Sequence, residues 1–382
     1  MKKFFKKFLY QKKINEGFFL IAFAVLAIFF ANSKLKNTYR FINEFSFFIK
    51  NNSTFLLKDF VNDFLMSLFF FLIGIEIKYE IKNGSLRKFK QTLLPIFCAL
   101  GGVLFPFMMY YFCNFYSSFF LKGCAIPTAT DIAFVISILS FLKNVPNSLR
   151  IFLLSIAIID DIIAIFIIAI FYGKEFQYIY FFLSIFSIFM LLVYKKNLFL
   201  YLIFSIVLWI FIFFSGIHAT IAGVLSGILF SIPEKRKIMN SSFLKTKRKI
   251  EKFSKFFILP IFAFCNSGID LQNFKITTIH STVFLGIFLG LSFGKPIGIT
   301  FFAWIFKKAK VVSFPKNITI KEIFSISVLC GIGFTMSIFL TNLSFYEKEE
   351  IVHISKFGIF FSGIFSSIFG YCILKRIFNE NK

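Results

Sequence analysis

Runs of apolar residues about as long as a membrane-spanning helix recur along the whole chain, with short polar stretches between them. A helix needs about 20 apolar residues to cross the hydrocarbon core of a bilayer. The pattern therefore predicts an all-α, polytopic membrane protein in which residues 1–382 form a single transmembrane domain. About twelve segments are expected to span the membrane, at 17–32, 59–77, 93–115, 123–142, 151–172, 179–194, 198–214, 218–231, 255–270, 282–306, 323–343 and 354–374.

The composition fits a chain surrounded by lipid. Hydrophobic residues make up 58% and charged residues 16% of the 382 residues, and the mean hydropathy is +0.81, which is more apolar than one soluble core requires. The formal net charge of +25 is spread over many short polar stretches, whereas a nucleic-acid-binding protein gathers such charge on one soluble face. We therefore expect the lipid bilayer, and no nucleic acid, as a partner.

Two further features of the composition add little. The six cysteines all lie in apolar runs and none has CxxC spacing, so they predict neither a zinc site nor a disulfide framework. The basic residues before position 17, followed by an apolar segment with small residues at its end, also fit a secretory signal peptide. The first helix of a multispanning protein performs the same targeting, and we favour that interpretation.

Lysine and arginine are distributed unevenly between alternate polar stretches. If the N-terminus is cytoplasmic, the stretches predicted inside, among them 1–16, 78–90 and 232–255, contain most of the 43 Lys and Arg residues. The outside stretches contain few, and the acidic run around Glu349 falls outside. Because Lys and Arg accumulate on the cytoplasmic side of membrane proteins, the pattern predicts twelve spans with both termini in the cytoplasm.

Two of the apolar segments are interrupted by residues that break helices. Residues 125–134 read AIPTATDIAF and residues 330–339 read CGIGFTMSIF. Backbone that is not helical at this depth has to face protein or a water-filled cavity, because lipid cannot hydrogen-bond to it. Broken helices in matching positions of two halves indicate an inverted-repeat transporter, with repeats at about 93–172 and 282–376.

The sharpest feature is a pair of adjacent aspartates, Asp160 and Asp161, inside the apolar run SIAIIDDIIAI. Burial disfavours the charged form of a carboxyl group and a neighbouring carboxylate disfavours it further, so the two groups titrate as a coupled unit. Such a pair can hold either a proton or a metal ion in competition, as a proton-coupled cation carrier requires. Since adjacent side chains on a helix point about 100° apart, we expect one aspartate to meet the ion and the other a partner.

Lys295, in SFGKPIGI, is the cation predicted to lie deep enough in the membrane to be that partner. A charged residue at this depth is costly unless it is paired or lines a cavity. The alternative is that Lys295 and one aspartate form a salt bridge whose role is only architectural. The second aspartate would then lack a countercharge.

Thr130 and Asp131 follow the break in the fourth segment. Two crossed broken helices bring together N-termini with partial positive charge and C-termini with partial negative charge, and a fixed Asp and Lys can compensate these dipoles. Asp131 can therefore be a dipole compensator or an ion ligand. Thr130 can offer a hydroxyl or carbonyl oxygen to a hard cation.

Three further ionisable side chains lie near the ends of predicted helices. Asp63 and Glu76 lie toward the periplasmic and cytoplasmic ends of 59–77. Both fit interfacial, solvated carboxylates, and Glu76 also fits an attractor of cations at the mouth of a cytoplasmic funnel. A lone histidine ordinarily titrates near neutral pH, so His218, in SGIHATIAGVLSGI, is either a pH sensor or a hydrogen-bonded structural histidine.

Seven motifs, in their order along nearly the full chain, resemble those of the NhaA-type sodium/proton antiporters. They are FFFLIGIEIKYEI, AIPTATDIAF, AIIDDIIAI, SGIHATIAGV, LPIFAFCNSGI, GKPIGI and CGIGFTMSIF. These antiporters are themselves known examples of inverted repeats, so the repeat interpretation is not independent of the resemblance. The resemblance implies twelve helices with helices 4 and 11 broken and crossed. It also implies a bacterial inner-membrane protein that exchanges cytoplasmic sodium or lithium for periplasmic protons, electrogenically and under pH control.

The resemblance further implies roles for single residues. Asp161 matches the carboxylate that binds the sodium ion and the proton, and Asp160 matches its neighbour, which contributes to the same site and pairs with the lysine of GKPIG, here Lys295. Either Lys295 or Asp160 would carry the second transported proton. Thr130 and Asp131 match the Thr-Asp pair of the fourth helix. Positions associated with cytoplasmic pH sensing match Glu76, His218 and Glu251.

Members of that family tend to form homodimers, often through a periplasmic segment that corresponds to residues 33–58, where no clear hairpin pattern is visible. Two other functions fit the same carboxylates. A symporter or uniporter of similar architecture should have a polar substrate cavity, and a membrane sensor would use them as a pH switch without ion flux. No nucleophile, metal set or nucleotide loop is recognisable, so we expect neither an enzyme nor a bound cofactor.

Overall fold

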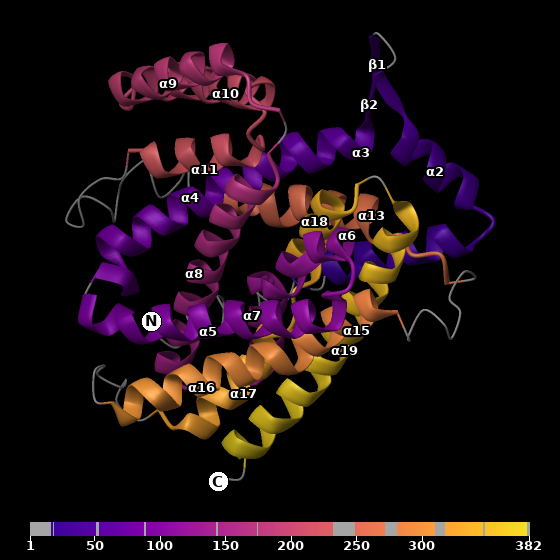
Figure 1. Ribbon diagram of the computed structural model, residues 1–382. Coiled ribbons are helices and arrows are strands. Elements are labelled where there is room, and N and C mark those ends of the chain that lie inside the picture. The colour runs from indigo at the N-terminus through magenta and orange to yellow at the C-terminus, as the bar shows by residue number, and fades with distance from the viewer. Residues whose placement is uncertain are drawn as a thin grey trace. The chain divides into compact units, whose positions relative to one another are not determined.

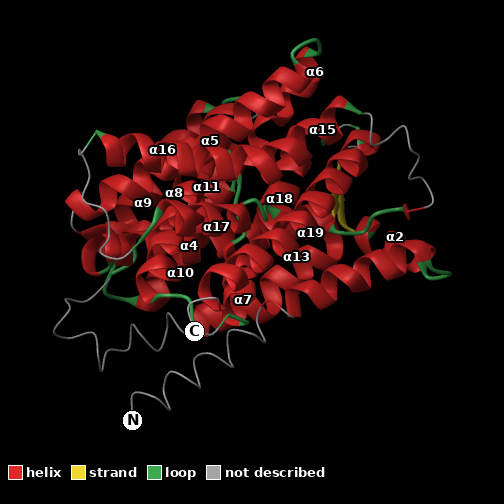
Figure 2. Cartoon of the chain, turned by 90° about the horizontal axis from the view of Figure 1, so that it is seen from below, coloured by secondary structure: helices red, strands yellow, loops and turns green. Residues whose placement is uncertain are grey.

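The computed structural model describes residues 17, 19–50, 53–87, 89–142, 144–173, 175–231, 249–271, 281–309, 318–346 and 348–379. The chain forms two compact units. We call Met1–Asn32, Lys88–Ala164 and Ser267–Lys382 the first unit, and Ser33–Arg87 with Ile165–Asn266 the second unit. Figures 1 and 2 show that the described residues are almost entirely helical.

Helices long and apolar enough to cross a membrane dominate the described residues. Six pass this test singly, and two pairs of helices separated by a short break pass it together, one of them bent by 51° between Ile320–Cys330 and Phe334–Ser344. The described residues also contain three shorter apolar helices and one helical segment made of Ser254–Ile258 and Leu259–Asn266. Each apolar run of the sequence therefore has a helical segment in the structure. The prediction of an all-α, polytopic membrane protein with about twelve helices is confirmed.

The elements of each unit follow in chain order. The first unit contains the helix Phe19–Asn32, α5 (Phe89–Asn114), α6 (Ser118–Leu121), the 3₁₀-helix η3 (Lys122–Thr128), α7 (Ile132–Ser140), most of α8 (Asn147–Phe171), α15 (Thr282–Leu289), the π-helix η7 (Gly290–Gly294), α16 (Lys295–Lys308), α17 (Ile320–Cys330), α18 (Phe334–Ser344) and α19 (Glu349–Asn379). The second unit contains α2 (Lys36–Glu44), β1 (Ser46–Lys50), β2 (Ser53–Leu56), α3 (Leu57–Phe60), the π-helix η1 (Val61–Leu65), α4 (Met66–Asn83), the 3₁₀-helix η2 (Ser85–Arg87), α9 (Tyr178–Val193), α10 (Leu198–Phe214), α11 (Thr220–Leu229), the π-helix η5 (Ser254–Ile258) and α13 (Leu259–Asn266).

Glycines allow α5 and α16 of the first unit to approach closely. A Cβ at Gly298 would lie 2.1 Å from the carbonyl oxygen of Gly101, so a side chain has no room there. The rings of Phe97 and Phe306 stack across the same pair of helices, with centroids 3.8 Å apart. Small residues drive helix association in lipid by permitting such contact. α16 therefore lies along α5 (Figure 1), which holds Lys295, its first residue, in the interior.

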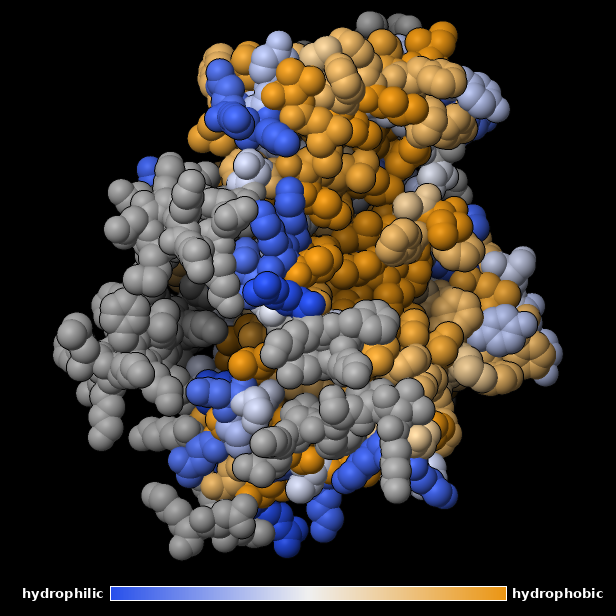
Figure 3. Space-filling model, turned by 90° about the vertical axis from the view of Figure 1, so that its left-hand side faces the viewer, coloured by the Kyte–Doolittle hydropathy of each residue, from blue (hydrophilic) through white to orange (hydrophobic). Residues whose placement is uncertain are grey.

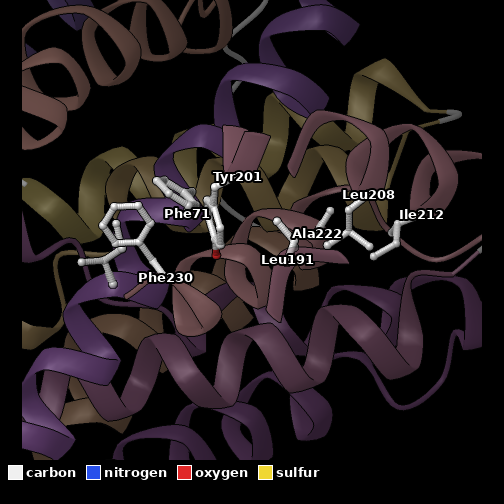
Figure 4. Packing of buried hydrophobic residues seen from close by; sticks show 8 residues of the cluster. Phe71, Leu191, Tyr201, Leu208, Ile212, Ala222 and Phe230 are labelled. Atoms are coloured by element: carbon white, nitrogen blue, oxygen red, sulfur yellow. The ribbon is translucent and has the colours of Figure 1, made fainter. Parts of the chain in front are cut away.

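The second unit has its own close helix pair, α4 with α11. A Cβ at Gly223 of α11 would lie 2.0 Å from the carbonyl oxygen of Ser67 in α4. The Tyr201 hydroxyl of α10 donates a hydrogen bond to the carbonyl of Ser226 in α11. The core around this pair, drawn in Figure 4, consists of Phe71, Ile75, Leu191, Tyr201, Leu208, Ile212, Ala222 and Phe230.

A short hairpin that the sequence analysis did not predict precedes α3. Its two strands are antiparallel, with Ser46 opposite Leu56 and Lys50 opposite Ser53. The sequence signal that would have found it is the pair of asparagines at 51–52, between two runs rich in Phe, Ile and Thr. The prediction missed the hairpin because it considered the polarity of the segment and not the two asparagines as a turn signal.

Large hydrophobic side chains are exposed over much of the described surface. Figure 3 shows one face on which such side chains cover a large area. Phe166, Ile170 and Phe171 near the end of α8 are all more than half exposed. A folded protein does not leave apolar areas of this size to water, so this surface fits the interior of a bilayer.

Candidate functional site

Both helices that the sequence marks as interrupted are broken in the structure. η3 gives way to α7 through residues 129–131, which are not helical. α17 gives way to α18 through residues 331–333, where the axis bends by 51°. A Cβ at Gly331 would lie 2.4 Å from the carbonyl oxygen of Leu291. Glycine at this position therefore lets η7 pack directly against the second break.

The two breaks contact each other in the interior of the first unit. The backbone N–H of Asp131 donates to the carbonyl of Ile332 at 2.7 Å. The Ser337 hydroxyl of α18 donates to the carbonyl of Ile126 in η3 at 2.8 Å. Each broken helix thus binds backbone groups that the other leaves free, which lipid cannot do. Residues in and beside the breaks are shielded as a result, and Thr130 is only 1% exposed.

Asp131 lies at the N-termini of both half-helices. Its Oδ1 accepts hydrogen bonds from the backbone N–H groups of Ala133 and Phe134 at 3.1 and 3.3 Å, in the first turn of α7. Its Oδ2 accepts from the N–H and the hydroxyl of Thr335 at 3.1 and 2.5 Å, in the first turn of α18. A carboxylate in this position is stabilised by the positive ends of two helix dipoles. Of the two readings of Asp131, this geometry favours the dipole compensator.

Asp160, Lys295 and Thr130 form a buried cluster beside the breaks. The Nζ of Lys295 lies 2.9 Å from Oδ2 of Asp160, and neither side chain is exposed. The Oγ1 of Thr130 lies 2.8 Å from the same Oδ2 and also accepts a hydrogen bond from Lys295. It is 3.3 Å from the carbonyl oxygen of Cys330, the last residue of α17. The ammonium group of Lys295 therefore stands close to the negative end of a half-helix.

One buried oxygen of this cluster is unused. Oδ1 of Asp160 has no hydrogen-bond partner among the described residues. Asp161, the next residue of α8, is 4% exposed, and helical geometry turns its side chain about 100° from that of Asp160. A buried acceptor without a donor is costly. Oδ1 of Asp160 is therefore an atom at which binding of a proton or a cation would be favourable.

The helix that carries Lys295 is irregular just before it. The π-helix η7 spans Gly290–Gly294, and Pro296 follows the lysine. Single π-helical turns are rare and occur often at functional sites. A second one, η1, contains Asp63 in the other unit. Neither turn was predicted, because the hydrophobic pattern of a π-helical turn does not differ visibly from that of an α-helix.

The remaining candidate residues lie in the second unit. The Nε2 of His218 is 3.8 Å from Oδ1 of Asp63, a pairing that the sequence analysis did not foresee. The Nδ1 of His218 lies 2.8 Å from Oγ1 of Thr220 and 3.4 Å from its backbone nitrogen, so Nε2 is the ring nitrogen that faces Asp63. Glu76 lies on α4 and Glu251 precedes η5, and both are half-buried.

Sequence reasoning missed the partners that hold the breaks together. Thr335 and Ser337 both follow the second break, in GFTMS, and bind Asp131 and the carbonyl of Ile126. Hydroxyl residues inside an apolar helix directly after a glycine-rich break were the available signal. Their partners lie some two hundred positions earlier in the chain, where no local pattern points to them.

Comparisons with known proteins show the family of the chain. The model of the family "Na+/H+ antiporter 1" matches residues 6–374. The Na+/H+ antiporter NhaA of Wigglesworthia glossinidia brevipalpis is 43% identical over 399 positions, covering 100% of this chain and 99% of the relative. NhaA 1 of Campylobacter hominis is 40% identical, and the match covers 96% of this chain and 94% of the relative. NhaA of Pelagibacter ubique is 40% identical, and the match covers 96% of each protein. The chain therefore belongs to the family of NhaA-type Na+/H+ antiporters.

Proposed function

We propose that this protein is a secondary active antiporter that expels cytoplasmic sodium or lithium and takes up periplasmic protons. The full-length match to the Na+/H+ antiporter family supports the identity of the exchanged ions. One observation carries the site assignment. Asp160 is fully buried, its Oδ2 is paired with Lys295, and its Oδ1 has no hydrogen-bond partner among the described residues. Asp161 is the next residue of the same helix.

In the proposed cycle, sodium and protons compete for the two aspartates. A protonated carboxyl group is neutral and attracts a cation weakly, whereas an ionised one binds a desolvated cation strongly. Sodium arriving from one side therefore binds as the protons leave, and protons arriving from the other side release it. Asp161 supplies the main carboxylate, Asp160 its unpartnered Oδ1, and Thr130 a hydroxyl oxygen 2.8 Å from the other oxygen of Asp160.

Electrogenic exchange requires that more than one proton moves for each sodium ion. Two residues are candidates for the second proton, Asp160 and Lys295. If Lys295 carries it, sodium binding at Asp160 breaks the 2.9 Å ion pair and the lysine loses its proton. Charge movement by a Lys295→Ala variant separates the two, because exchange by that variant stays electrogenic only if Asp160 carries the proton.

Asp131 and Lys295 are proposed to compensate the dipoles of the crossed half-helices, Asp131 at the two N-termini and Lys295 near the C-terminus of α17. Regulation by pH is proposed to involve Glu76, His218 and Glu251. The contact between His218 and Asp63 supports this role for the histidine, since protonation would convert it into an ion pair.

The assembly and location proposed here follow the family and the charge pattern. The protein is proposed to be a homodimer in a bacterial inner membrane, with both termini in the cytoplasm and inverted repeats at about 93–172 and 282–376. The excess of Lys and Arg in alternate polar stretches supports the orientation. The two broken helices, one in each proposed repeat, support the repeats.

Sodium-driven proton movement in everted vesicles tests the function. The natural chain, Asp161→Asn and Glu175→Gln are compared between about pH 6 and 9, a range that begins near a histidine's ordinary pKa. Sodium should collapse a preformed pH gradient with the natural chain and with Glu175→Gln, whose carboxylate is exposed in a loop. Asp161→Asn should insert and fold but show no response, because an amide cannot exchange a proton for a cation.

Two results would overturn the proposal. Near-normal exchange by Asp161→Asn would remove that residue from the site. No response by folded natural protein at any pH would favour the sodium-coupled symporter or the non-transporting pH sensor. Radioactive sodium uptake without proton movement would then identify the symporter, and absence of any flux would identify the sensor.

A further inference from the structure

We propose that an anionic phospholipid binds in a groove between α7 and α19 of the first unit. The groove has a volume of about 440 Å³. One wall comes from α7 and the residue after it, and the other from α19, whose C-terminal end lies close to α7 (Figure 2). The lining residues are Ile138, Phe141, Ser367, Ile368, Tyr371 and Cys372.

The groove has the apolar character that suits part of an acyl chain. None of its lining residues is charged, and Phe141 and Ile368 are 60% and 57% exposed. One turn before Ser367, a Cβ at Gly363 would meet no atom within 4 Å, so the surface stays open in that direction. The lining residues of α19, from Ser367 to Cys372, span roughly 8 Å along the helix axis, about half the thickness of one leaflet of the hydrocarbon core, so the groove holds part of an acyl chain.

Positive charge lies at one end of the groove. The Nζ of Lys375 is 6.0 Å from the centroid of the Tyr371 ring, so the ammonium group stands over a lining residue, and the adjacent Arg376 is also exposed. Arg150 of α8 binds the carbonyl of Leu142 at 2.9 Å, one residue beyond the lining residue Phe141. Apolar lining that ends in basic residues matches a phospholipid whose head group is anionic.

The location of the groove gives such a lipid access to the transport machinery. α7 is the half of the fourth helix that begins directly after Asp131. A lipid seated against α7 would therefore bias the position of this half-helix. The effect of the lipid on α7 rests on the proposed antiport function, whereas lipid binding itself does not. A negative result for lipid binding in detergent therefore leaves the antiport function untouched, and absence of transport leaves lipid binding untouched.

Lipid binding to the purified full-length protein in detergent tests the proposal. Dioleoylphosphatidylglycerol and dioleoylphosphatidylcholine are titrated separately and bound lipid is counted by native mass spectrometry. The site is located by the rate at which a maleimide modifies Cys372, which is exposed in the groove, relative to the half-buried Cys113. Phosphatidylglycerol should slow the modification of Cys372 more than phosphatidylcholine does, and leave that of Cys113 unchanged.

Variants separate the head-group and acyl-chain contributions. Lys375→Gln with Arg376→Gln should weaken phosphatidylglycerol binding by on the order of tenfold and leave phosphatidylcholine binding unchanged. Lys307→Gln with Lys308→Gln is the matched control, because these two basic residues are also exposed in the last turn of a helix. Ser367→Phe should fill the groove and weaken the binding of both lipids.

Three results would overturn the proposal. The first is equal protection of Cys372 by the two lipids. The second is unchanged phosphatidylglycerol binding by the folded Lys375/Arg376 variant, or an equal loss in the Lys307/Lys308 control. The third is protection of Cys372 that grows with protein concentration in the absence of lipid, which would assign the groove to a second copy of the chain. If Ser367→Phe fails to fold, the charge variants and the modification rate of Cys372 still test whether the lipid binds in the groove.

Discussion

At the scale of single residues, the ion pair between Lys295 and Asp160 determines how the buried cluster is held together. The Lys295→Ala variant leaves the carboxylate of Asp160 buried without its cation. Removing one partner of a buried pair costs roughly 3–5 kcal/mol, so the melting temperature of the purified protein in detergent should fall markedly. Lys307→Ala, at an exposed position of the same helix, should change it little. Equal melting temperatures for both variants would show that the pair does not stabilise the fold.

A second residue-scale prediction concerns the hydroxyl that links the breaks. Thr335 donates to Oδ2 of Asp131 through both its N–H and its Oγ1. Thr335→Val keeps the shape but removes the hydroxyl, and the loss of a hydrogen bond to a charged group should cost about 1.5–3 kcal/mol. Thr335→Ser retains the donor and should behave nearly as the natural chain. Thermal unfolding of the three proteins checks this, and a valine variant as stable as the serine variant would contradict it.

At the scale of elements, the contact between α5 and α16 requires glycine. Gly298→Ala would place a methyl group 2.1 Å from the carbonyl oxygen of Gly101, so the helices must separate, at a cost of roughly 1–3 kcal/mol for overpacking. Gly363→Ala adds the same methyl group where nothing lies within 4 Å, and it should not destabilise. The yield of monodisperse protein and its melting temperature distinguish the two, and a stable Gly298→Ala variant would refute the close packing.

The end of α7 is a second place where one element depends on another. Arg150 of α8 donates to the carbonyls of Leu139 and Leu142 at 3.4 and 2.9 Å, which lie at the negative end of the α7 dipole. Arg150→Gln should lower the free energy of unfolding by about 1–2 kcal/mol, and Arg150→Lys by less, since it keeps the charge. Thermal unfolding should rank the three proteins in that order, and a glutamine variant more stable than the lysine variant would argue against the dipole contribution.

At the scale of the whole molecule, the charge pattern makes a prediction about orientation. Alkaline phosphatase fused after Lys382 should be inactive and a fluorescent protein at the same position should be bright, because both report a cytoplasmic C-terminus. Alkaline phosphatase inserted within residues 33–58, a stretch predicted to be periplasmic, should be active. The reverse pattern would invert the proposed orientation and with it the direction of exchange.

Much of the fold could be predicted because membrane insertion depends on local properties. Each apolar run of the sequence contains a helical segment in the structure, and both predicted breaks occur within the motifs that suggested them. The hairpin β1–β2 was missed because its sequence signal is a pair of asparagines rather than a long hydrophobic run. Segment ends also differ by a few residues. For example, α11 begins at Thr220, two positions after His218.

Less of the candidate site could be predicted, because its contacts join distant parts of the chain. Two adjacent aspartates were evident, but which of them pairs with Lys295 depends on the rotation of α8 about its axis and on the position that α16 takes against α5. The structure pairs the lysine with Asp160. Asp131 and Thr335 are 204 positions apart in the sequence. Asp63 and His218 are also far apart in the sequence.

The sequence by itself determined that this chain resides in a membrane, where its helices are interrupted, and which few ionisable residues lie at depth. These conclusions follow from the length and polarity of contiguous segments, since lipid accepts only long apolar helices and penalises every buried charge. Only the tertiary structure decided which groups compensate one another. The contact between the two breaks, the buried Asp160–Lys295 pair and the aspartate shared by two half-helices depend on long-range packing, which no local pattern encodes.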